Sequence, residues 1–169
     1  MKKLKLGVSS CLLGESVRYN GEHKRDSTVI DLLGQQFEAV PVCPEVELGM
    51  GVPREPVRLV ANDASSERMV GSESGKDWTQ AMVDFNSIKL EALRQQNLSG
   101  FIFKSHSPSC GPGNVPLHHE QEKSSTVGLF AHALMQYFPS LPVIDEEALQ
   151  DEIVRQDFVA RVIQYGEKV

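Results

Sequence analysis

Three cysteines carry the strongest chemical signal in the sequence: Cys11, Cys43 and Cys110. Their odd number and wide separation do not match the framework of a disulfide-stabilised secreted domain. The sequence has no C-x-x-C pair and so lacks the usual spacing of a zinc ribbon. A zinc site could still combine these cysteines with one histidine; the candidates are His106, His118 and His119. An iron–sulfur cluster is the other group that such thiolates hold.

An iron–sulfur site with three cysteines would have a specific reactivity. Three thiolates on a four-iron cube leave one iron without a protein ligand, and that iron is exchangeable and Lewis-acidic. Cys110 lies in the segment KSHSPSCGPG (104–113), where glycine and proline allow the backbone to close around a bulky group. The residues themselves leave both iron–sulfur and zinc open.

Side chains near the cysteines could move protons or bind a substrate. Glu45 follows Cys43 by two residues in the segment CPE, where a carboxylate can transfer protons at a metal-bound ligand or simply be solvated. Hydroxyl groups crowd the loop before the third cysteine and can contact a substrate or stabilise a turn; they belong to Ser105, Ser107 and Ser109. A scattered basic set could bind an anion or lie dispersed on the surface: Arg18, His23, Lys24, Arg25, Arg54 and Arg58.

Two strands must position the first two cysteines. Leu4 to Ser10 is a short apolar run that predicts a strand, with Cys11 just past its end. Phe37 to Val42 predicts a second strand, and Cys43 follows it directly. A proline within this second run indicates an edge or irregular strand, because proline cannot donate to a sheet ladder.

The second half of the chain predicts two more strands and three helices. Bulky residues 101–103 form a strand that leads into the Cys110 loop, and LPVID (141–145) is another candidate strand. Apolar residues at helical spacing predict helices over 77–98, from Ser125 or Thr126 to Tyr137, and around Val154 to Tyr165. This alternation favours an α/β fold, with a Rossmann-like, mostly parallel sheet and helices on both faces. Sites in such sheets lie beyond the carboxyl ends of the strands, where all three cysteines are expected.

Length and composition narrow the function classes. The 169 residues suit a single domain over 1–169, with a mobile polar surface loop at about 61–76. The net charge of −6 has the wrong sign for tight binding to a phosphate backbone, which disfavours nucleic acid as a partner. The sequence has neither a secretory h-region nor the roughly 20 apolar residues of a membrane span, so we expect a cytoplasmic protein.

Five segments of the chain resemble one known family, the thiouracil desulfidases, long catalogued only as an uncharacterised domain. They are SSCLLGESVRYNG (9–21), VPVCPEVELGMGVPREPVRL (40–59), KSHSPSCG (104–111), GLFA (128–131) and LPVIDEEAL (141–149). The resemblance implies a cytoplasmic α/β enzyme with a 4Fe-4S cluster on three cysteines, matching Cys11, Cys43 and Cys110. The catalytic acid of the family matches Glu45, and its substrate-contacting serine matches Ser105.

The resemblance also indicates which class of substrate to expect. Larger relatives carry a further domain and are linked to thiolated uridine in RNA, whereas this chain stops at Val169. Together with the acidic balance, this favours a free base, nucleoside or nucleotide over RNA. The expected function is non-redox removal of sulfur from a thiolated pyrimidine such as thiouracil, thiouridine or its nucleotide, with release of hydrogen sulfide.

In this hypothesis Glu45 would activate water or carry its proton, and Ser105 would orient the ring. Further substrate-binding candidates are Ser107, Ser109, Arg18 and His23. The alternatives are desulfuration of 4-thiouridine in transfer RNA, a structural zinc protein, and a redox or sulfur-carrier protein. A sulfur carrier would need an exposed cysteine of low pKa.

Overall fold

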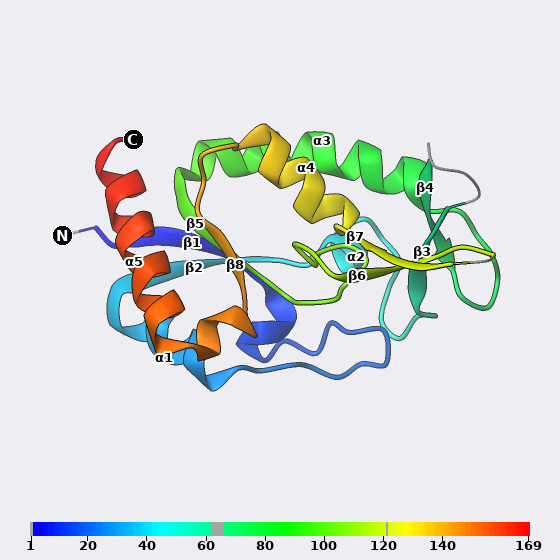
Figure 1. Ribbon diagram of the computed structural model, residues 1–169, viewed down its shortest axis with the longest axis horizontal. Helices are drawn as coiled ribbons and strands as arrows, with labels where there is room; N and C mark the ends of the chain where they lie inside the picture. Colours follow the sequence, from blue (N-terminus) through cyan, green and yellow to red (C-terminus); the bar gives the residue numbers. More distant parts are fainter. Residues whose placement is uncertain (1, 62–65, 121) are drawn as a thin grey trace.

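A parallel sheet of four strands carries the cysteine-bearing loops (Figure 1). The computed structural model describes residues 2–61, 66–120 and 122–169. The strands lie in the order β2-β1-β5-β8; their bounds are β1 (Leu4–Ser9), β2 (Phe37–Val42), β5 (Leu98–Phe103) and β8 (Val143–Asp145). All four were predicted from the sequence, although β5 begins at Leu98 rather than Phe101. Pro41 lies in β2 at the edge of the sheet, as its missing N–H predicted.

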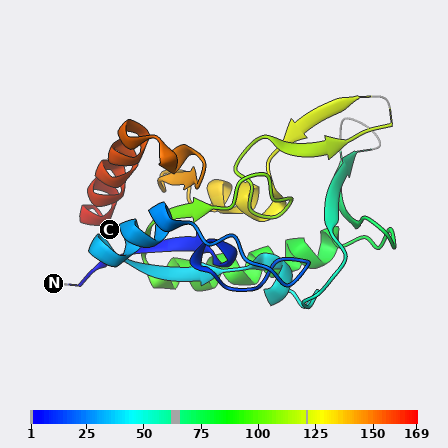
Figure 2. The same cartoon turned by 90° about the horizontal axis from the view of Figure 1, so that it is seen from below.

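Helices cover both faces of this sheet, which confirms the predicted α/β architecture of a single domain (Figure 2). One face packs against α1 (Ser27–Gln36) and α5 (Glu152–Glu167), and the other against α3 (Thr79–Gln96) and α4 (Leu129–Tyr137). The helix α1 escaped prediction. It begins after Asp26, whose carboxylate accepts a hydrogen bond from the Val29 amide. No helix in the described ranges is long and apolar enough to cross a membrane.

Alternating side chains of β5 connect the two layers of the core. Phe101 and Phe103 stack at a centroid distance of 4.4 Å within the cluster that includes α3 and α4. Ile102 points to the opposite face and packs in the cluster that includes Phe158 of α5. Gly7 on the neighbouring strand leaves space for Phe101, because a Cβ there would collide with the phenyl ring. Both faces of the strand are therefore buried, as is typical of a parallel sheet.

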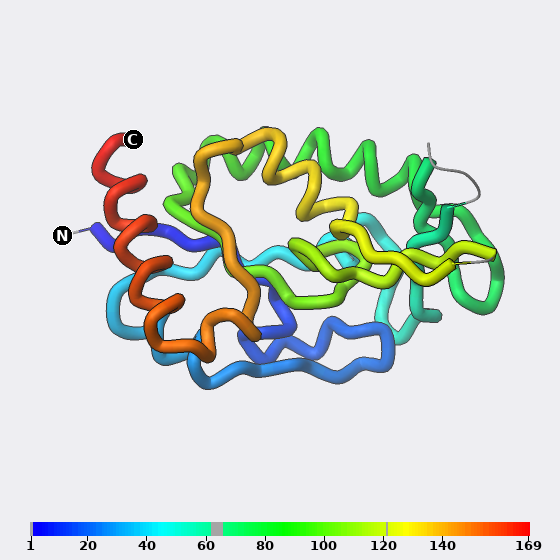
Figure 3. Tube along the Cα trace, in the orientation of Figure 1, coloured from blue at the N-terminus to red at the C-terminus, as the bar shows by residue number. Residues whose placement is uncertain are grey.

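A second, mixed sheet was not predicted. It lies at the end of the molecule away from both termini (Figures 1 and 3). Its order is β4-β3-β6-β7; the strands are β3 (Val57–Ala61), β4 (Glu67–Gly71), β6 (Val115–His118) and β7 (Lys123–Thr126). The loop predicted over 61–76 is wrong for residues 67–71, which pair with β3; residues 62–65 lie outside the described part.

The predicted cap of α4 is also wrong. Ser125 and Thr126 belong to β7 and pair with β6, and the helix begins at Leu129 after Gly128. The sequence KSST of β7 has no buried residue and therefore no alternation of apolar and polar side chains. Backbone pairing with β6 defines this strand, and such pairing leaves no local signal.

Candidate active site

The three cysteines lie beyond the carboxyl ends of β1, β2 and β5 and line one cavity of about 300 Å³. Cys11 belongs to the short 3-10 helix η1 (Ser10–Leu13), and Cys43 caps the short helix α2 (Pro44–Glu47). Cys110 lies in the loop after β5 and is buried. The structure thus brings the cysteines together at one rim of the sheet, as their positions after predicted strands indicated.

Burial makes all three thiols weak acids in the absence of a metal. It raises the pKa of Cys11 to about 11, although the nearby Lys104 ammonium acts in the opposite direction. Burial likewise raises the pKa of Cys43, and it raises the pKa of Cys110 well above its ordinary value. A sulfur or redox carrier would instead need a thiol with a low pKa. Metal binding must therefore displace the protons of these thiols.

The donor set and the cavity fit a polynuclear metal group. The three thiols line one cavity of about 300 Å³, which has room for a group larger than a single ion. Of the candidate fourth ligands for zinc, only His106 lines the cavity, and its ring nitrogens contact the Asn114 carbonyl and Glu147. In the described ranges no three Cys, His, Asp or Glu side chains group closely enough for one metal ion. These thiols suit the iron–sulfur group of the sequence hypothesis.

Glu45 lines the cavity beside Cys43, and both of its carboxylate oxygens are held in place. Oε1 accepts a hydrogen bond from Arg54 Nε at 3.2 Å, and Oε2 accepts one from Ser109 Oγ at 2.9 Å. The Glu45 side chain is only 14% exposed. Each oxygen keeps a free lone pair, so the carboxylate has a fixed orientation and can still accept a proton or a water hydrogen bond.

Arg54 ties this carboxylate to two loops. Its Nη1 donates to the Gly51 carbonyl and its Nη2 to the Val17 carbonyl, each at 2.9 Å. The Arg54 side chain is 7% exposed. These bonds use three of the five N–H donors of the guanidinium, so Arg54, which also lines the cavity, acts as a structural clamp between Glu45 and the two loops.

The other predicted basic residues divide between the cavity and its surroundings. Arg18 and Lys24 line the cavity. His23, Arg25 and Arg58 are not among the lining residues, and the His23 Nδ1 accepts a hydrogen bond from the Arg25 amide. Of the two basic candidates for substrate binding, the structure therefore brings Arg18 to the site and not His23.

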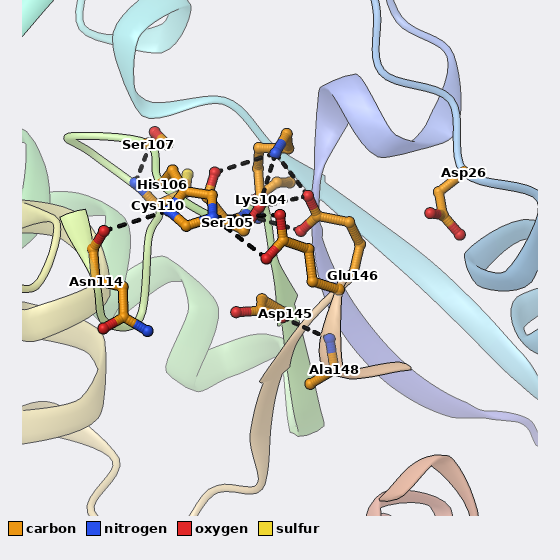
Figure 4. A network of polar contacts seen from close by, with 12 residues as sticks. Asp26, Lys104, Ser105, His106, Ser107, Cys110, Asn114, Asp145, Glu146 and Ala148 are labelled. Atoms are coloured by element: carbon orange, nitrogen blue, oxygen red, sulfur yellow. Dashed lines mark hydrogen bonds and ion pairs between the residues drawn. The ribbon is translucent and has the colours of Figure 1, made fainter. Parts of the chain in front are cut away.

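The three serines before Cys110 have different environments, and Figure 4 shows those of Ser105 and Ser107. Ser105 lines the cavity, and its Oγ donates to Glu146 Oε1 at 2.7 Å. Ser107 also lines the cavity, but its Oγ accepts the amide hydrogens of Ser109 and Cys110 and so shapes the loop. Ser109 is not a lining residue and holds Glu45. Ser105 is thus the serine best placed to contact a substrate.

Sequence reasoning missed two charged residues of the site, Lys104 and Glu146. Their side chains form an ion pair with an Nζ–Oε1 distance of 2.5 Å (Figure 4). Each residue directly follows a strand, Lys104 after β5 and Glu146 after β8. The strand-end rule that located the cysteines would have found both, had it been applied to charged residues as well.

We expect Arg54→Met to lower the free energy of unfolding by about 3 kcal/mol, because it leaves a buried carboxylate without its cation and two carbonyls without a donor. Urea titration in a fixed cluster state measures this loss. Arg68→Met is the matched control, since Arg68 forms an exposed pair with Asp77 and should cost less than about 1 kcal/mol. Equal losses in the two variants would contradict the role of Arg54 as a clamp.

The chain is similar to known proteins over much of its length. A model of the 2-thiouracil desulfurase family matches residues 6–146. The uncharacterised protein YbbK of Bacillus subtilis (strain 168) is 34% identical over 112 residues, which cover 64% of this chain and 74% of that protein. A solved structure of the 4Fe-4S-dependent thiouracil desulfidase TudS has a TM-score of 0.67 at 30% identity, covering 92% of this chain and 99% of that chain.

Proposed function

Because the chain belongs to the 2-thiouracil desulfurase family, we propose that it replaces the sulfur of a thiolated pyrimidine by oxygen, without net redox change. One observation carries this proposal. Three cysteines from separate strand ends line one cavity together with a fixed carboxylate two residues after Cys43, in a fold similar to a 4Fe-4S-dependent desulfidase. The overall reaction consumes one water for each sulfur that leaves.

Cys11, Cys43 and Cys110 would hold a 4Fe-4S cluster with one open iron. When bound, this group supplies a Lewis acid suited to a soft sulfur ligand. The chain itself contributes a cavity wall that includes apolar side chains able to contact a flat ring; among them are Val42, Pro56, Val57 and Pro108.

Glu45 is the proposed general base and acid. Arg54 and Ser109 hold its carboxylate in one orientation, so a free lone pair can accept a proton from the attacking water. The water oxygen forms a bond to the ring carbon and the carbon–sulfur bond breaks. Both protons of the water end on the departing sulfur, which gives hydrogen sulfide and a uracil-type carbonyl. Electrons balance without any oxidant or reductant.

We expect small substrates to be preferred over RNA, with a nucleoside monophosphate at least about tenfold better in kcat/KM than the bare base. Arg18 and Lys24 line the cavity, and the described part of the chain shows no carboxylate paired with either. One phosphate can take charge-assisted hydrogen bonds from them, each worth about 1.5–3 kcal/mol. The net charge of −6 opposes a long phosphate backbone.

The assay compares anaerobic sulfide release from 2- and 4-thiouracil, thiouridine, its monophosphate and thiolated transfer RNA at equal concentration and moderate salt. The Arg18→Gln, Lys24→Gln double variant should lose the advantage of the monophosphate while keeping turnover of the bare base. If transfer RNA is preferred by a wide margin, the small-substrate proposal is wrong.

A further inference from the structure

A largely buried polar network joins the ends of β5 and β8 beside the cavity, and two of its members, Lys104 and Ser105, line that cavity (Figure 4). It consists of Lys104, Ser105 and Glu146. Ser105 is 4% exposed, and the side chains of Lys104 and Glu146 are 21% and 11% exposed. Glu146 accepts from the Ser105 amide through Oε2 at 2.7 Å, and its Oε1 accepts from both Lys104 Nζ and Ser105 Oγ.

In the described part of the chain, the hydrogen-bond partners of the Lys104 ammonium all belong to Ser105 and Glu146. Its ammonium carries three N–H groups. Three acceptors surround it at hydrogen-bonding distance: the Ser105 carbonyl at 3.0 Å, Ser105 Oγ at 2.9 Å and Glu146 Oε1 at 2.5 Å. The ammonium therefore positions Ser105 and Glu146.

The charges on both sides fix the direction of the Ser105 hydroxyl. An ammonium can only donate and an ionised carboxylate can only accept. Burial would raise the pKa of Glu146, but the hydrogen bonds from Lys104 and Ser105 outweigh it and lower that pKa, so the carboxylate is ionised. With its hydrogen directed at Glu146, the Ser105 hydroxyl can only accept a hydrogen bond from any further group.

Resting on the proposed function, we propose that Ser105 offers the substrate one hydrogen-bond acceptor and no donor, and that the site thereby selects a thiolated ring carrying an N–H at this point. Lys104 and Glu146 are positioning residues, because they act through Ser105. In a pyrimidine nucleoside N1 is bonded to the ribose, so N3–H is the ring N–H that can donate a hydrogen bond to Ser105 Oγ. The site thus requires the thiocarbonyl form of the substrate with its N3 hydrogen present.

Methylated substrates test this directly. The cluster-loaded protein is assayed with 4-thiouridine, its N3-methyl derivative and its 5-methyl derivative, the last adding the same group while keeping N3–H. We expect the N3-methyl compound to lose about 100-fold in kcat/KM relative to the 5-methyl control, because a buried acceptor is left without its donor. Calorimetric binding of uridine and N3-methyluridine gives a second readout without turnover, where at least about tenfold weaker binding of the methylated ligand is expected.

Two variants distinguish a hydrogen-bonding role of Ser105 and Glu146 from a role in packing alone. Ser105→Ala removes the acceptor, and the 100-fold preference should shrink to less than about tenfold with the cluster retained. Glu146→Gln replaces one acceptor oxygen by an amide that can donate to Ser105, which frees the hydroxyl hydrogen to turn toward the cavity. The preference for the substrate with N3–H should therefore shrink in Glu146→Gln as well. The double variant Ser105→Ala, Glu146→Gln should reduce this preference no further. If Glu146→Gln fails to fold, the substrate preference of Ser105→Ala alone tests the proposal.

Two outcomes overturn the inference. The wild-type protein could desulfurate the N3-methyl compound as fast as the 5-methyl control, or either variant could retain the full preference with its cluster intact. Both leave the proposed function standing, since 4-thiouridine is still turned over. Absence of sulfide release from every thiolated pyrimidine would instead remove the proposed function and this inference with it.

Discussion

Replacement of any one of Cys11, Cys43 and Cys110 by alanine should remove the iron–sulfur cluster and abolish sulfide release. The three thiols come from three separate strand ends around one cavity, so no neighbouring cysteine can substitute for a lost ligand. Two thiolates rarely hold a four-iron cube. Anaerobically purified wild-type protein should be brown and contain about four iron and four acid-labile sulfide per chain. Each variant should contain almost none of either.

Glu38→Gln provides the parallel control for these variants, because Glu38 is an exposed residue of β2, the strand that leads to Cys43. It should keep full iron content after the same purification. Circular dichroism confirms that each alanine variant is folded. A variant that kept its full iron and sulfide would remove that cysteine from the ligand set, and colourless wild-type protein with one zinc per chain would refute the cluster.

Glu45→Gln should behave differently, keeping the brown cluster but losing about 10²–10⁴-fold in kcat. The amide preserves the size of the side chain and leaves an oxygen to accept from Arg54 or Ser109. It cannot take a proton from water at neutral pH. Single-turnover measurement of uracil formation, normalised to the iron content of each sample, isolates this effect from cluster loss.

The same Glu38→Gln variant controls for loss of one acidic residue and should show wild-type turnover. Full activity of Glu45→Gln with an intact cluster would show that another group activates the water. Reduced iron content in Glu45→Gln would instead point to a structural role beside Cys43.

Much of the candidate site could be predicted because its cysteines follow strands, two of which have clear apolar patterns. Leu6 and Val8 in β1 are fully buried, and Val42 closes β2 in the same way. In a parallel sheet the carboxyl ends of such strands share one edge, so Cys11 and Cys43 meet without any sequence proximity. The match of these motifs then indicated the family, which a family model over residues 6–146 confirms.

The parts that escaped prediction depend on contacts between distant segments. The strand β7 pairs through its backbone while its side chains are exposed or half-buried, so its sequence gives no pattern. The role of Arg54 depends on Val17 and Gly51 carbonyls that fold beside it. The pairing of Lys104 with Glu146 spans 42 residues. Sequence spacing cannot reveal whether such a cation is free for a substrate or already bound.

The most direct test of the central claim is anaerobic sulfide release from thiouracil, measured against iron content across samples reconstituted to different degrees. We predict that the rate rises in proportion to 4Fe-4S content, with one uracil formed for each sulfide released, and that it disappears when air destroys the cluster. Equal rates in cluster-free or zinc-loaded protein would contradict the account. So would a fully loaded protein that releases no sulfide from any thiolated pyrimidine.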